Sequence, residues 1–403
     1  MEKVKTVLVG LGGYGGHHMR LLRETIDPSS FSLQGIVDPF AKSAEQYAYV
    51  QEQGIPVYDT LEEFYKQKSA QLAIIASPIP LHREQSICAM EHGSHVLCEK
   101  PIASTVQDAL VMEEAAGRLG KKLGIGFQWS FSTTMRTLKK DILDGVYGRP
   151  VMLKTLISWQ RFDDYYQNGW KGHVRDGKGN WVLDSVTSNA TAHYLHNLFF
   201  LMGDRPDTAA APVDMRAGLY RAKQIESFDT CFLTGAFPNG GRFCYIATHA
   251  AEVEQDPCFC YQFEKGTVVM DVKTQHVTAT LEDGRTIDYG YPQGTASLAE
   301  KDTLMLRAAV SDEQPPCTIK TALPCLQVCN ALFDQCDIRS FPGELVFRTE
   351  NPGGTFVKGL FEGICACYEQ AALPDELHLS WAQPSQPVDI GGYTRFEGKK
   401  FQD

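Results

Sequence analysis

The sequence has little excess positive charge, no dense cysteine framework and no long apolar run. Its 403 residues include 38 Lys and Arg against 49 Asp and Glu, which gives a net charge of −11. Proteins that track nucleic-acid phosphates normally present a basic field, so this balance argues against a nucleic-acid partner. No apolar stretch approaches the roughly 18 residues of a membrane span. We therefore expect a small-molecule partner, and neither nucleic acid nor a membrane.

The 12 cysteines are too sparse for a secreted disulfide scaffold, and none of them forms a CxxC pair. The closest pairs, Cys258/Cys260 and Cys365/Cys367, are tighter than the usual zinc spacing. The first residues carry two lysines before an apolar stretch, as a signal peptide does, but no small-residue cleavage site follows. These features predict reduced thiols, no metal site and a cytoplasmic protein.

The first part of the chain alternates β-type apolar runs with stretches of helical spacing. This alternation predicts a doubly wound parallel sheet with helices on both faces. The expected strands are residues 5–9, 33–37, 72–75, 95–97 and 123–126, and the expected helices are residues 14–26, 41–52, 60–67, 82–92 and 105–119.

The pattern changes from about residue 150, where β-type runs are separated by Gly, Asn and Asp turns. It predicts an α+β domain with a large, mostly antiparallel sheet, interrupted by one helix over 184–202. The expected strands are residues 151–158, 231–237, 242–249, 259–264, 267–271 and 276–281. The predicted domains are residues 1–126, 127–345 and a C-terminal extension, 346–403, without clear elements.

A glycine-rich turn directly follows the first predicted strand and opens a helix. It reads GxGxxG, with Gly10, Gly12, Gly13, Tyr14 and Gly15. In this context the first glycine allows a tight turn, the second lets the backbone approach a pyrophosphate, and Gly15 lets the helix pack closely on the strand. Asp38 ends the next strand, where its carboxylate would bind the adenosine ribose. The alternative is a glycine turn that binds no ligand.

The residues after Asp38 bear on the choice of cofactor. Pro39, Phe40 and Ala41 offer no arginine for a 2′-phosphate, and Lys42 is the nearby cation. The sequence therefore favours NAD over NADP.

Further motifs follow the next strands of the predicted sheet. They are SPIPLH at residues 77–82, GSHVLCEKP at 93–101, GIGFQ at 124–128 and GVYGRP at 145–150. Together with the glycine turn and Asp38, they resemble the Gfo/Idh/MocA family of NAD(P)-dependent oxidoreductases. The similarity is nearly continuous over residues 4–203 and looser to about 345.

That resemblance implies a Rossmann domain followed by a domain whose open sheet often forms the oligomer interface, here of a homodimer or homotetramer. It also implies hydride transfer at a hydroxyl-bearing carbon, with Lys100 positioning the hydroxyl and a histidine sharing the proton transfer. The cofactor-binding residues that it implies, beyond the glycine turn and Asp38, are Ser77, Pro78, His82, Glu99, Lys100 and Gln128.

The family's second motif is D-x-G-x-H on a helix, followed by Leu-x-Gly with its glycine ten residues beyond the histidine. Counting back ten residues from Gly203 places the histidine at His193. The acid position is then Asn189, which can bind a hydroxyl but cannot raise the basicity of histidine as a carboxylate would. On a helix, residues four apart share a face, so we expect Asn189 and His193 to point together. Asp184 is a candidate to supply the acid that Asn189 lacks, or it simply lies near the start of the helix. His196, three residues after His193, offers a weak alternative in which the two histidines bind a metal.

The stretch of residues 159–171 is rich in aromatic rings and polar donors. Rings of this kind stack on sugars while charged groups bind hydroxyls, although the same residues could simply anchor the domain. The substrate-binding candidates are Trp129, Trp159, Arg161, Tyr165, Trp170, Asn189 and His193, and the catalytic candidates are Lys100, His193 and Asn189.

These observations predict an NAD-dependent oxidoreductase acting on a secondary alcohol of a sugar, inositol or glycoside. Two alternatives stay open. One is a redox-neutral enzyme that retains NAD and cleaves a glycoside, and the other is a non-catalytic nucleotide- or sugar-sensing regulator on the same fold.

Overall fold

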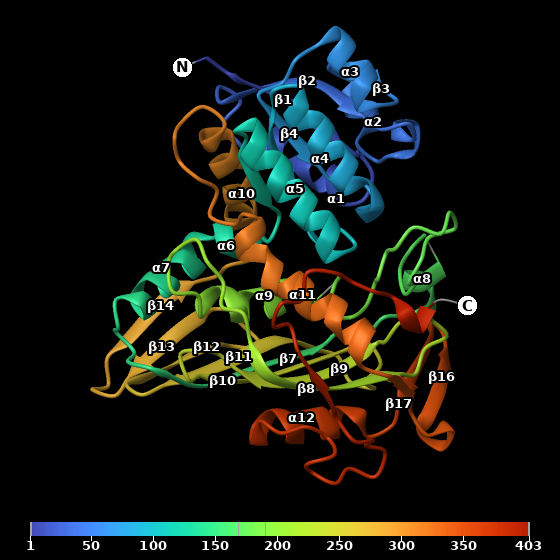
Figure 1. The fold of residues 1–403 in the computed structure, drawn as a ribbon, viewed down its shortest axis with the longest axis vertical. Coiled ribbons are helices and arrows are strands. Elements are labelled where there is room, and N and C mark those ends of the chain that lie inside the picture. Colours follow the sequence, from blue (N-terminus) through green and yellow to red (C-terminus); the bar gives the residue numbers. More distant parts are fainter. Residues whose placement is uncertain (1, 168, 190, 402–403) are drawn as a thin grey trace. The chain divides into compact units, whose positions relative to one another are not determined.

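The structure is a computed structural model that describes residues 2–167, 169–189 and 191–401. The chain divides into two compact units (Figure 1): Met1–Thr133 with Gln293–Leu323, and Thr134–Pro292 with Pro324–Asp403. Asn168 and Ala190, which fall within the predicted loop and helix, lie outside the described residues. Within those described ranges, no helix has both the length and the apolar character needed to cross a membrane.

The first unit contains the predicted doubly wound sheet. Its six strands are all parallel and lie in the order β3-β2-β1-β4-β5-β6. The strands are β1 (Val4–Val9), β2 (Phe31–Val37), β3 (Val57–Tyr58), β4 (Leu72–Ile75), β5 (His95–Cys98) and β6 (Leu123–Ile125). Every residue of β4 is buried, as expected of a strand that helices cover on both faces. The predicted fold class is confirmed for this unit.

Helices of the first unit follow the predicted pattern with one interruption. They are α1 (Tyr14–Glu24), α2 (Tyr47–Glu52), α3 (Leu61–Gln67), α4 (His82–Glu91), α5 (Val106–Leu119), α6 (Gln128–Phe131) and α10 (Thr295–Ala308). The single helix expected over 41–52 is wrong, because Ala44 is extended between a short 3-10 turn and α2. The Ser43 hydroxyl donates to the Phe40 carbonyl, a local bond that competes with helix formation.

Helix α10 is a part of the first unit that the sequence did not predict there. The segment that contains it, Gln293–Leu323, comes from far along the chain but packs with the first 133 residues. Lys122 Nζ donates to the Ala308 carbonyl at 2.9 Å, and Ile125 N donates to the Cys317 carbonyl at 2.9 Å. These bonds attach the segment to β6 and the residue before it.

The second unit is built on a large mixed sheet, as predicted. Along it the order is β14-β13-β12-β11-β7-β10-β9-β8-β15, with β18 also paired to β8. Most neighbours are antiparallel, but the pairs β7/β10 and β8/β15 are parallel. The strands are β7 (Pro150–Ser158), β8 (Val213–Arg221), β9 (Thr230–Ala236), β10 (Arg242–Thr248), β11 (Gln255–Phe263), β12 (Gly266–Met270), β13 (Val277–Leu281), β14 (Thr286–Gly290), β15 (Ile338–Ser340) and β18 (Gln386–Val388).

The long helix expected over 184–202 is shorter than predicted. Helix α9 spans Ala192–Leu201, and residues 186–189 form a turn before it. The Ser185 hydroxyl accepts a bond from Ser188 N, and the Ser188 hydroxyl accepts one from Ser185 N at 2.9 Å. Such side-chain bonds give the backbone an alternative to helix, so the helix begins only after them.

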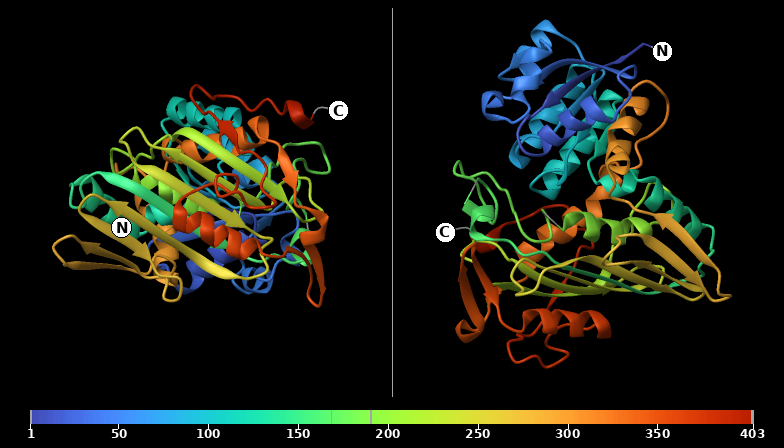
Figure 2. Two further views of the ribbon diagram at one scale, coloured as in Figure 1. Left: turned by 90° about the horizontal axis from the view of Figure 1, so that it is seen from below. Right: turned by 180° about the vertical axis from the view of Figure 1, so that it is seen from behind.

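The C-terminal extension is ordered, which corrects the expectation that it lacks clear elements. It holds a hairpin of β16 (Val346–Glu350) and β17 (Gly353–Val357), then α12 (Leu360–Gln370) and β18. The other helices in the second part of the chain are α7 (Thr133–Leu143), α8 (Asp163–Gln167) and α11 (Ile319–Gln335). Helix α12 lies on the face of the large sheet opposite to α9 (Figures 1 and 2).

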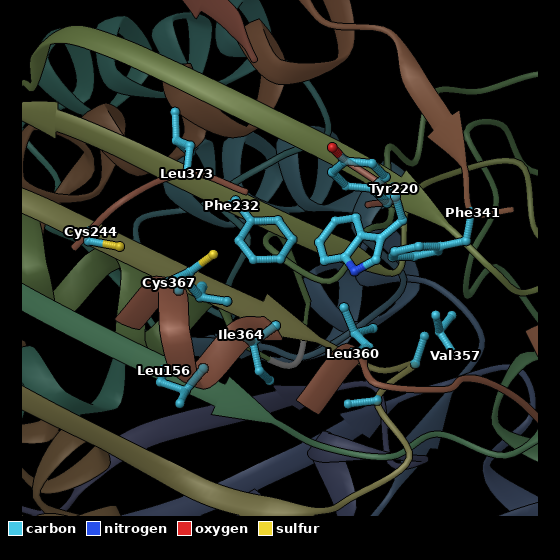
Figure 3. Packing of buried hydrophobic residues seen from close by; sticks show 14 of the residues in the cluster. Leu156, Tyr220, Phe232, Cys244, Phe341, Val357, Leu360, Ile364, Cys367 and Leu373 are labelled. Carbon is cyan, nitrogen blue, oxygen red and sulfur yellow. The ribbon is translucent and has the colours of Figure 1, made fainter. Parts of the chain in front are cut away.

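Apolar packing holds α12 on the sheet. Leu360 and Ile364 of α12 share one buried cluster with Leu156 of β7 and Phe232 of β9 (Figure 3). The ring of Trp381, which follows α12, lies 5.8 Å from that of Phe232. The extension therefore completes a core on this side of the sheet.

Candidate functional site

The glycine turn between β1 and α1 has the geometry that its sequence predicts. Gly10 has a φ of 87°, and a Cβ there would lie 2.7 Å from the Ala76 carbonyl oxygen. A Cβ on Gly15 would collide with the Gly10 carbonyl, whereas one on Gly12 would meet nothing within 4 Å. Gly13 precedes the first turn of α1, whose N–H groups can bind an anion. The turn is therefore tightly packed from behind and open at Gly12.

Asp38 and the glycine turn line one hollow of about 220 Å³. Leu11 N donates to Asp38 Oδ2 and Phe40 N donates to Asp38 Oδ1, both at 2.8 Å. These bonds fix the carboxylate beside the turn, where a ribose would lie. Arg20 lines the same hollow. The residues that follow Asp38 gave no sign of this cation, because Arg20 lies on α1, before Asp38 in the chain.

The residues after β4 are held together by His82. This histidine is buried, and its two ring nitrogens lie 2.9 Å from the carbonyl oxygens of Ser77 and Pro101. Pro78 precedes a 3-10 turn, Ile79–Leu81, that leads into α4. His82 thus ties the loop after β4 to the segment after β5. A direct contact of Ser77, Pro78 or His82 with a cofactor stays a prediction.

Lys100 follows β5 at the carboxyl edge of the parallel sheet, where doubly wound folds bind ligands. Its backbone N donates to Glu99 Oε2 at 3.2 Å. Lys100 is half-buried, whereas Glu99 is only 5% exposed. The position of Lys100 therefore depends on how the buried Glu99 carboxylate is held.

Glu99 belongs to a cluster of four buried ionisable residues, which we call the charge cluster: His18, Glu99, Lys301 and Asp302. Glu99 Oε1 accepts from Lys301 Nζ and lies 3.0 Å from His18 Nε2, and His18 Nδ1 lies 2.8 Å from Asp302 Oδ2. His18, Lys301 and Asp302 are fully buried. Two acids and two bases thus compensate one another inside the first unit.

The charge cluster shifts the pKa values of its members. Burial would raise the pKa of Glu99, but Lys301 and His18 hold it well below its usual range. For His18, burial lowers the pKa, and Asp302 and the hydrogen bond to Glu99 outweigh it, so the pKa is raised. The cluster therefore keeps Glu99 ionised beside Lys100. Sequence reasoning missed Lys301 and Asp302, because nothing in the pattern joins α10 to β5.

Tyr14 connects the glycine turn to the last part of the Rossmann sheet. Its hydroxyl donates to Gln128 Oε1 at 2.9 Å, and Lys301 Nζ lies 4.7 Å from its ring centroid. Two residues predicted to bind the cofactor are thus in contact. Trp129, beside Gln128, is only 1% exposed and lies in the core of its unit. Its ring therefore presents almost no surface to a ligand, and its stacking on a sugar stays a prediction.

Four of the predicted substrate residues lie together in the second unit. The Arg161 guanidinium carbon lies 5.4 Å from the Trp159 ring centroid and 5.2 Å from that of Tyr165. Asn189 Nδ2 donates to the Tyr165 hydroxyl at 3.0 Å. The aromatic-rich stretch and the residue at the family's acid position therefore meet around Tyr165.

His249 and Tyr166 extend this group, and sequence reasoning missed both. The Tyr166 hydroxyl lies 2.8 Å from His249 Nδ1, and Arg161 N donates to the His249 carbonyl at 3.3 Å. Arg161 and His249 follow the ends of β7 and β10, which are parallel neighbours. The proximity of Arg161 and His249 could not be predicted, because the sequence does not show that β7 and β10 are parallel neighbours. Arg161, Tyr165, Tyr166, Lys171 and His249 are called the donor cluster below.

His193 is the second residue of α9 and is half-buried. The expectation that it shares a helix face with Asn189 is wrong, because Asn189 precedes the helix. The next residue, Tyr194, packs against Trp159 with ring centroids 5.6 Å apart. Because Trp159 also contacts Arg161, the start of α9 lies near the donor cluster. Trp170 is half-buried in the turn after α8.

Asp184 and His196 have structural surroundings. Asp184 Oδ2 accepts from Gly172 N, so it holds a turn and does not begin the helix. His196 is fully buried, its ring stacks on Phe200, and burial lowers its pKa to about 3. In the part of the chain that the structure describes, no three His, Cys, Asp or Glu residues are grouped as metal ligands would be.

Comparison with known proteins identifies relatives of this chain. The model of an oxidoreductase family with an NAD-binding Rossmann fold, GFO_IDH_MocA, matches residues 4–127. A scyllo-inositol 2-dehydrogenase (NADP(+)) of Bacillus subtilis is 32% identical over 277 residues, which are 68% of this chain and 79% of that protein. A 1,5-anhydro-D-fructose reductase of Ensifer adhaerens is 31% identical over 178 residues, 44% of this chain and 51% of that protein.

The chain thus spans about half the length of the first curated relatives that it matches. Among solved structures, the aldose-aldose oxidoreductase of Caulobacter crescentus superimposes with a TM-score of 0.68 at 20% identity. The superposition covers 82% of this chain and 96% of that one. It supports the fold of both units.

Proposed function

Because this chain belongs to the Gfo/Idh/MocA family of oxidoreductases with an NAD-binding Rossmann fold, we propose that it transfers a hydride between NAD and a secondary alcohol of a sugar, inositol or glycoside. One observation carries the proposal. Lys100 lies at the carboxyl edge of the parallel sheet, and its backbone is bonded to a buried, ionised Glu99. Relatives named as a scyllo-inositol 2-dehydrogenase and a 1,5-anhydro-D-fructose reductase support the same chemistry.

The first unit fits a dinucleotide, which accepts or gives the hydride when it is bound. The open face at Gly12 admits a pyrophosphate, and the N–H groups at the start of α1 bind its charge. Asp38 accepts the ribose hydroxyls and repels a 2′-phosphate, so NAD is preferred over NADP. Arg20, in the same hollow, works against that preference.

In this proposal Lys100 donates a hydrogen bond to the reacting oxygen and stabilises the alkoxide that develops on it. His193 accepts the hydroxyl proton, a role that histidine side chains take in many enzymes. Asn189 orients a hydroxyl without adding negative charge. Trp159, Arg161, Tyr165 and Trp170 bind the sugar ring and its substituents, and Trp129 is a further candidate for substrate binding.

The test follows nicotinamide absorbance when the purified chain and NAD meet a panel of inositols, aldoses and glycosides. Wild type should reduce NAD with at least one compound. Lys100→Met should lower kcat by about a hundredfold or more, the usual contribution of such a group. Lys66→Met, which removes an exposed lysine of the same unit, is the matched control and should leave kcat unchanged.

The alternatives give different results in this assay. A redox-neutral enzyme would cleave a glycoside without net change in nicotinamide absorbance. A regulator would bind NAD and a sugar without turnover, and Lys100→Met would then have no activity to reduce.

We also propose that copies of the chain associate, as homodimers or homotetramers, and act in the cytoplasm. The resemblance implies that the open face of the large sheet forms the interface. Here α12 already covers part of that face, where Leu360 and Ile364 pack on Leu156. Association would therefore use another surface or the strands beyond α12, and sedimentation of the full chain would measure it.

A further inference from the structure

The donor cluster lies beyond the carboxyl ends of β7 and β10, two central strands of the large sheet in the second unit. Trp159 N donates to the Thr248 carbonyl at 3.1 Å, and Arg161 N donates to the His249 carbonyl. The bonds run on past the parallel pair of β7 and β10, so Arg161 and His249 stay side by side after the strands end. Their positions are therefore set by backbone bonds and not by a flexible loop.

Two cations of the donor cluster share one aromatic ring. Lys171 Nζ lies 4.2 Å from the Tyr165 ring centroid, and the Arg161 guanidinium carbon lies 5.2 Å from it. Each contact with the ring is favourable by itself. Together the two contacts bring two positive charges close to each other, and their repulsion costs free energy in the absence of an anion. The donor cluster therefore carries charges of one sign, whereas the acids and bases of the charge cluster compensate one another.

The neighbouring acids are engaged elsewhere. Asp163 accepts from Arg348 Nη2 at 2.6 Å. Asp229 Oδ2 accepts the backbone N–H groups of Ala222 and Lys223 at 2.8 Å, and Asp184 accepts from Gly172 N. None of these bonds directs a carboxylate oxygen to Arg161 or Lys171, so the positive charge there is left without a bonded acid within the described residues.

Two side-chain nitrogens of the cluster are buried and unsatisfied. Arg161 Nε and His249 Nε2 make no hydrogen bond to any residue that the structure describes. His249 itself is 2% exposed. Buried donors are almost always paired in folded proteins, so two of them side by side indicate a place for an acceptor. If the Tyr166 hydroxyl donates to Nδ1, the ring proton of a neutral His249 is on Nε2.

We infer that the donor cluster binds an anionic substituent of the sugar, a carboxylate or a phosphate, through Arg161, Lys171 and His249. The inference rests on the proposed function, which supplies the sugar, and narrows its substrate class to acidic sugars. An arginine presents paired N–H groups that match either anion. The half-buried Trp159 and Tyr165 rings beside it offer faces for the ring of the same molecule.

The test measures binding by calorimetry, without turnover. The probes are glucose, glucuronate, glucose 6-phosphate and inorganic phosphate, each added to the full chain with saturating NADH, which cannot accept a hydride from an alcohol. We expect glucuronate, glucose 6-phosphate or both to bind at least about tenfold more tightly than glucose, which corresponds to about 1.4 kcal/mol. The two acidic sugars distinguish a carboxylate site from a phosphate site, and inorganic phosphate shows whether the anion alone suffices.

Arg161→Gln should abolish the preference for the acidic sugar. Arg175→Gln removes the same charge from the same unit, where Arg175 lies over Trp181, and should leave the preference unchanged. Equal affinities for glucose and both acidic sugars would overturn the inference, as would a preference that survives Arg161→Gln.

This outcome is separate from that of the proposed function. If acidic sugars bind selectively but no sugar reduces NAD, the oxidoreductase proposal fails and the anion site stands. If neutral sugars are oxidised as efficiently as acidic ones, the oxidoreductase proposal stands and the anion site fails.

Discussion

The charge cluster and the donor cluster solve different problems with similar residues. In the first unit, His18, Glu99, Lys301 and Asp302 are buried and bonded mainly to one another. In the second unit, Arg161 and His249 keep buried donors that no described residue accepts. One cluster is electrically balanced, and the other carries excess positive charge.

The difference separates positioning from recognition. A balanced set of buried charges adds rigidity but offers nothing to a ligand, so the charge cluster can only hold Lys100 and Tyr14 in place. An unbalanced set costs stability in the absence of a ligand and gains it on binding. We therefore expect mutations in the first cluster to act mainly on folding, and those in the second mainly on substrate affinity.

Removing one partner from each cluster should show the largest effect. Lys301→Met leaves the buried Glu99 without its cation, so the free energy of unfolding should fall by about 3–5 kcal/mol. Arg161→Met breaks no ion pair of the described residues and should change it by about 1 kcal/mol or less. Urea unfolding of both variants measures the two values.

A second variant tests the reason for that loss. Glu99→Gln added to Lys301→Met removes the unpaired charge and should recover part of the lost stability. Equal losses for Lys301→Met and Arg161→Met would break the comparison between the clusters.

The pH dependence of stability should identify His18. Its raised pKa means that His18 contributes its full stabilisation below the unfolded pKa of about 6.5 and loses it as the pH rises through the folded value. The difference in unfolding free energy between wild type and His18→Gln should therefore be largest near pH 6 and shrink above it. Each pKa unit of elevation corresponds to about 1.4 kcal/mol.

The matched variant for this measurement is His249→Gln in the donor cluster. Burial, together with Arg161 and Lys223, lowers the pKa of His249 well below its usual value. Its protonation opposes folding, so its contribution should change in the opposite direction, with wild type losing stability relative to the variant as the pH falls below about 6.5. Parallel pH profiles for the two variants would contradict the assignment.

The smallest effect concerns the cofactor. Asp38→Asn keeps one side-chain oxygen to accept from Leu11 N or Phe40 N, loses the second of these bonds, and removes the negative charge that opposes a 2′-phosphate. The ratio of kcat/KM for NAD to that for NADP should fall by about tenfold. Arg20→Gln should move the ratio the other way. If neither variant changes the ratio of kcat/KM for NAD to that for NADP, this hollow does not distinguish a ribose from its 2′-phosphate.

Much of the first unit could be predicted from the sequence because its signals are local. The glycine turn, Asp38 and the strands of the parallel sheet each occupy a short stretch of chain. The charge cluster could not, because it joins residues near positions 18, 99 and 301. No single-sequence pattern reports that α10 returns to this unit.

The second unit was harder to predict for the same reason. The aromatic loop and Asn189 were identified, but the pairing of Arg161 with His249 depends on β7 lying parallel to β10. A single helix was predicted over 184–202, and the Ser185–Ser188 bonds favour a turn at its expected start. The C-terminal extension was missed because its apolar residues form a core only against the sheet.

The central claim is hydride transfer between a sugar alcohol and NAD. It is tested most directly with the sugar that the absorbance panel identifies, deuterated at each carbinol carbon in turn, and mass analysis of the nicotinamide. The account predicts one deuterium in the reduced nicotinamide from wild type, for one carbon position, and at least about a hundredfold less of it per unit time from Lys100→Met. Product formed from every deuterated sugar with no deuterium in the nicotinamide would contradict it.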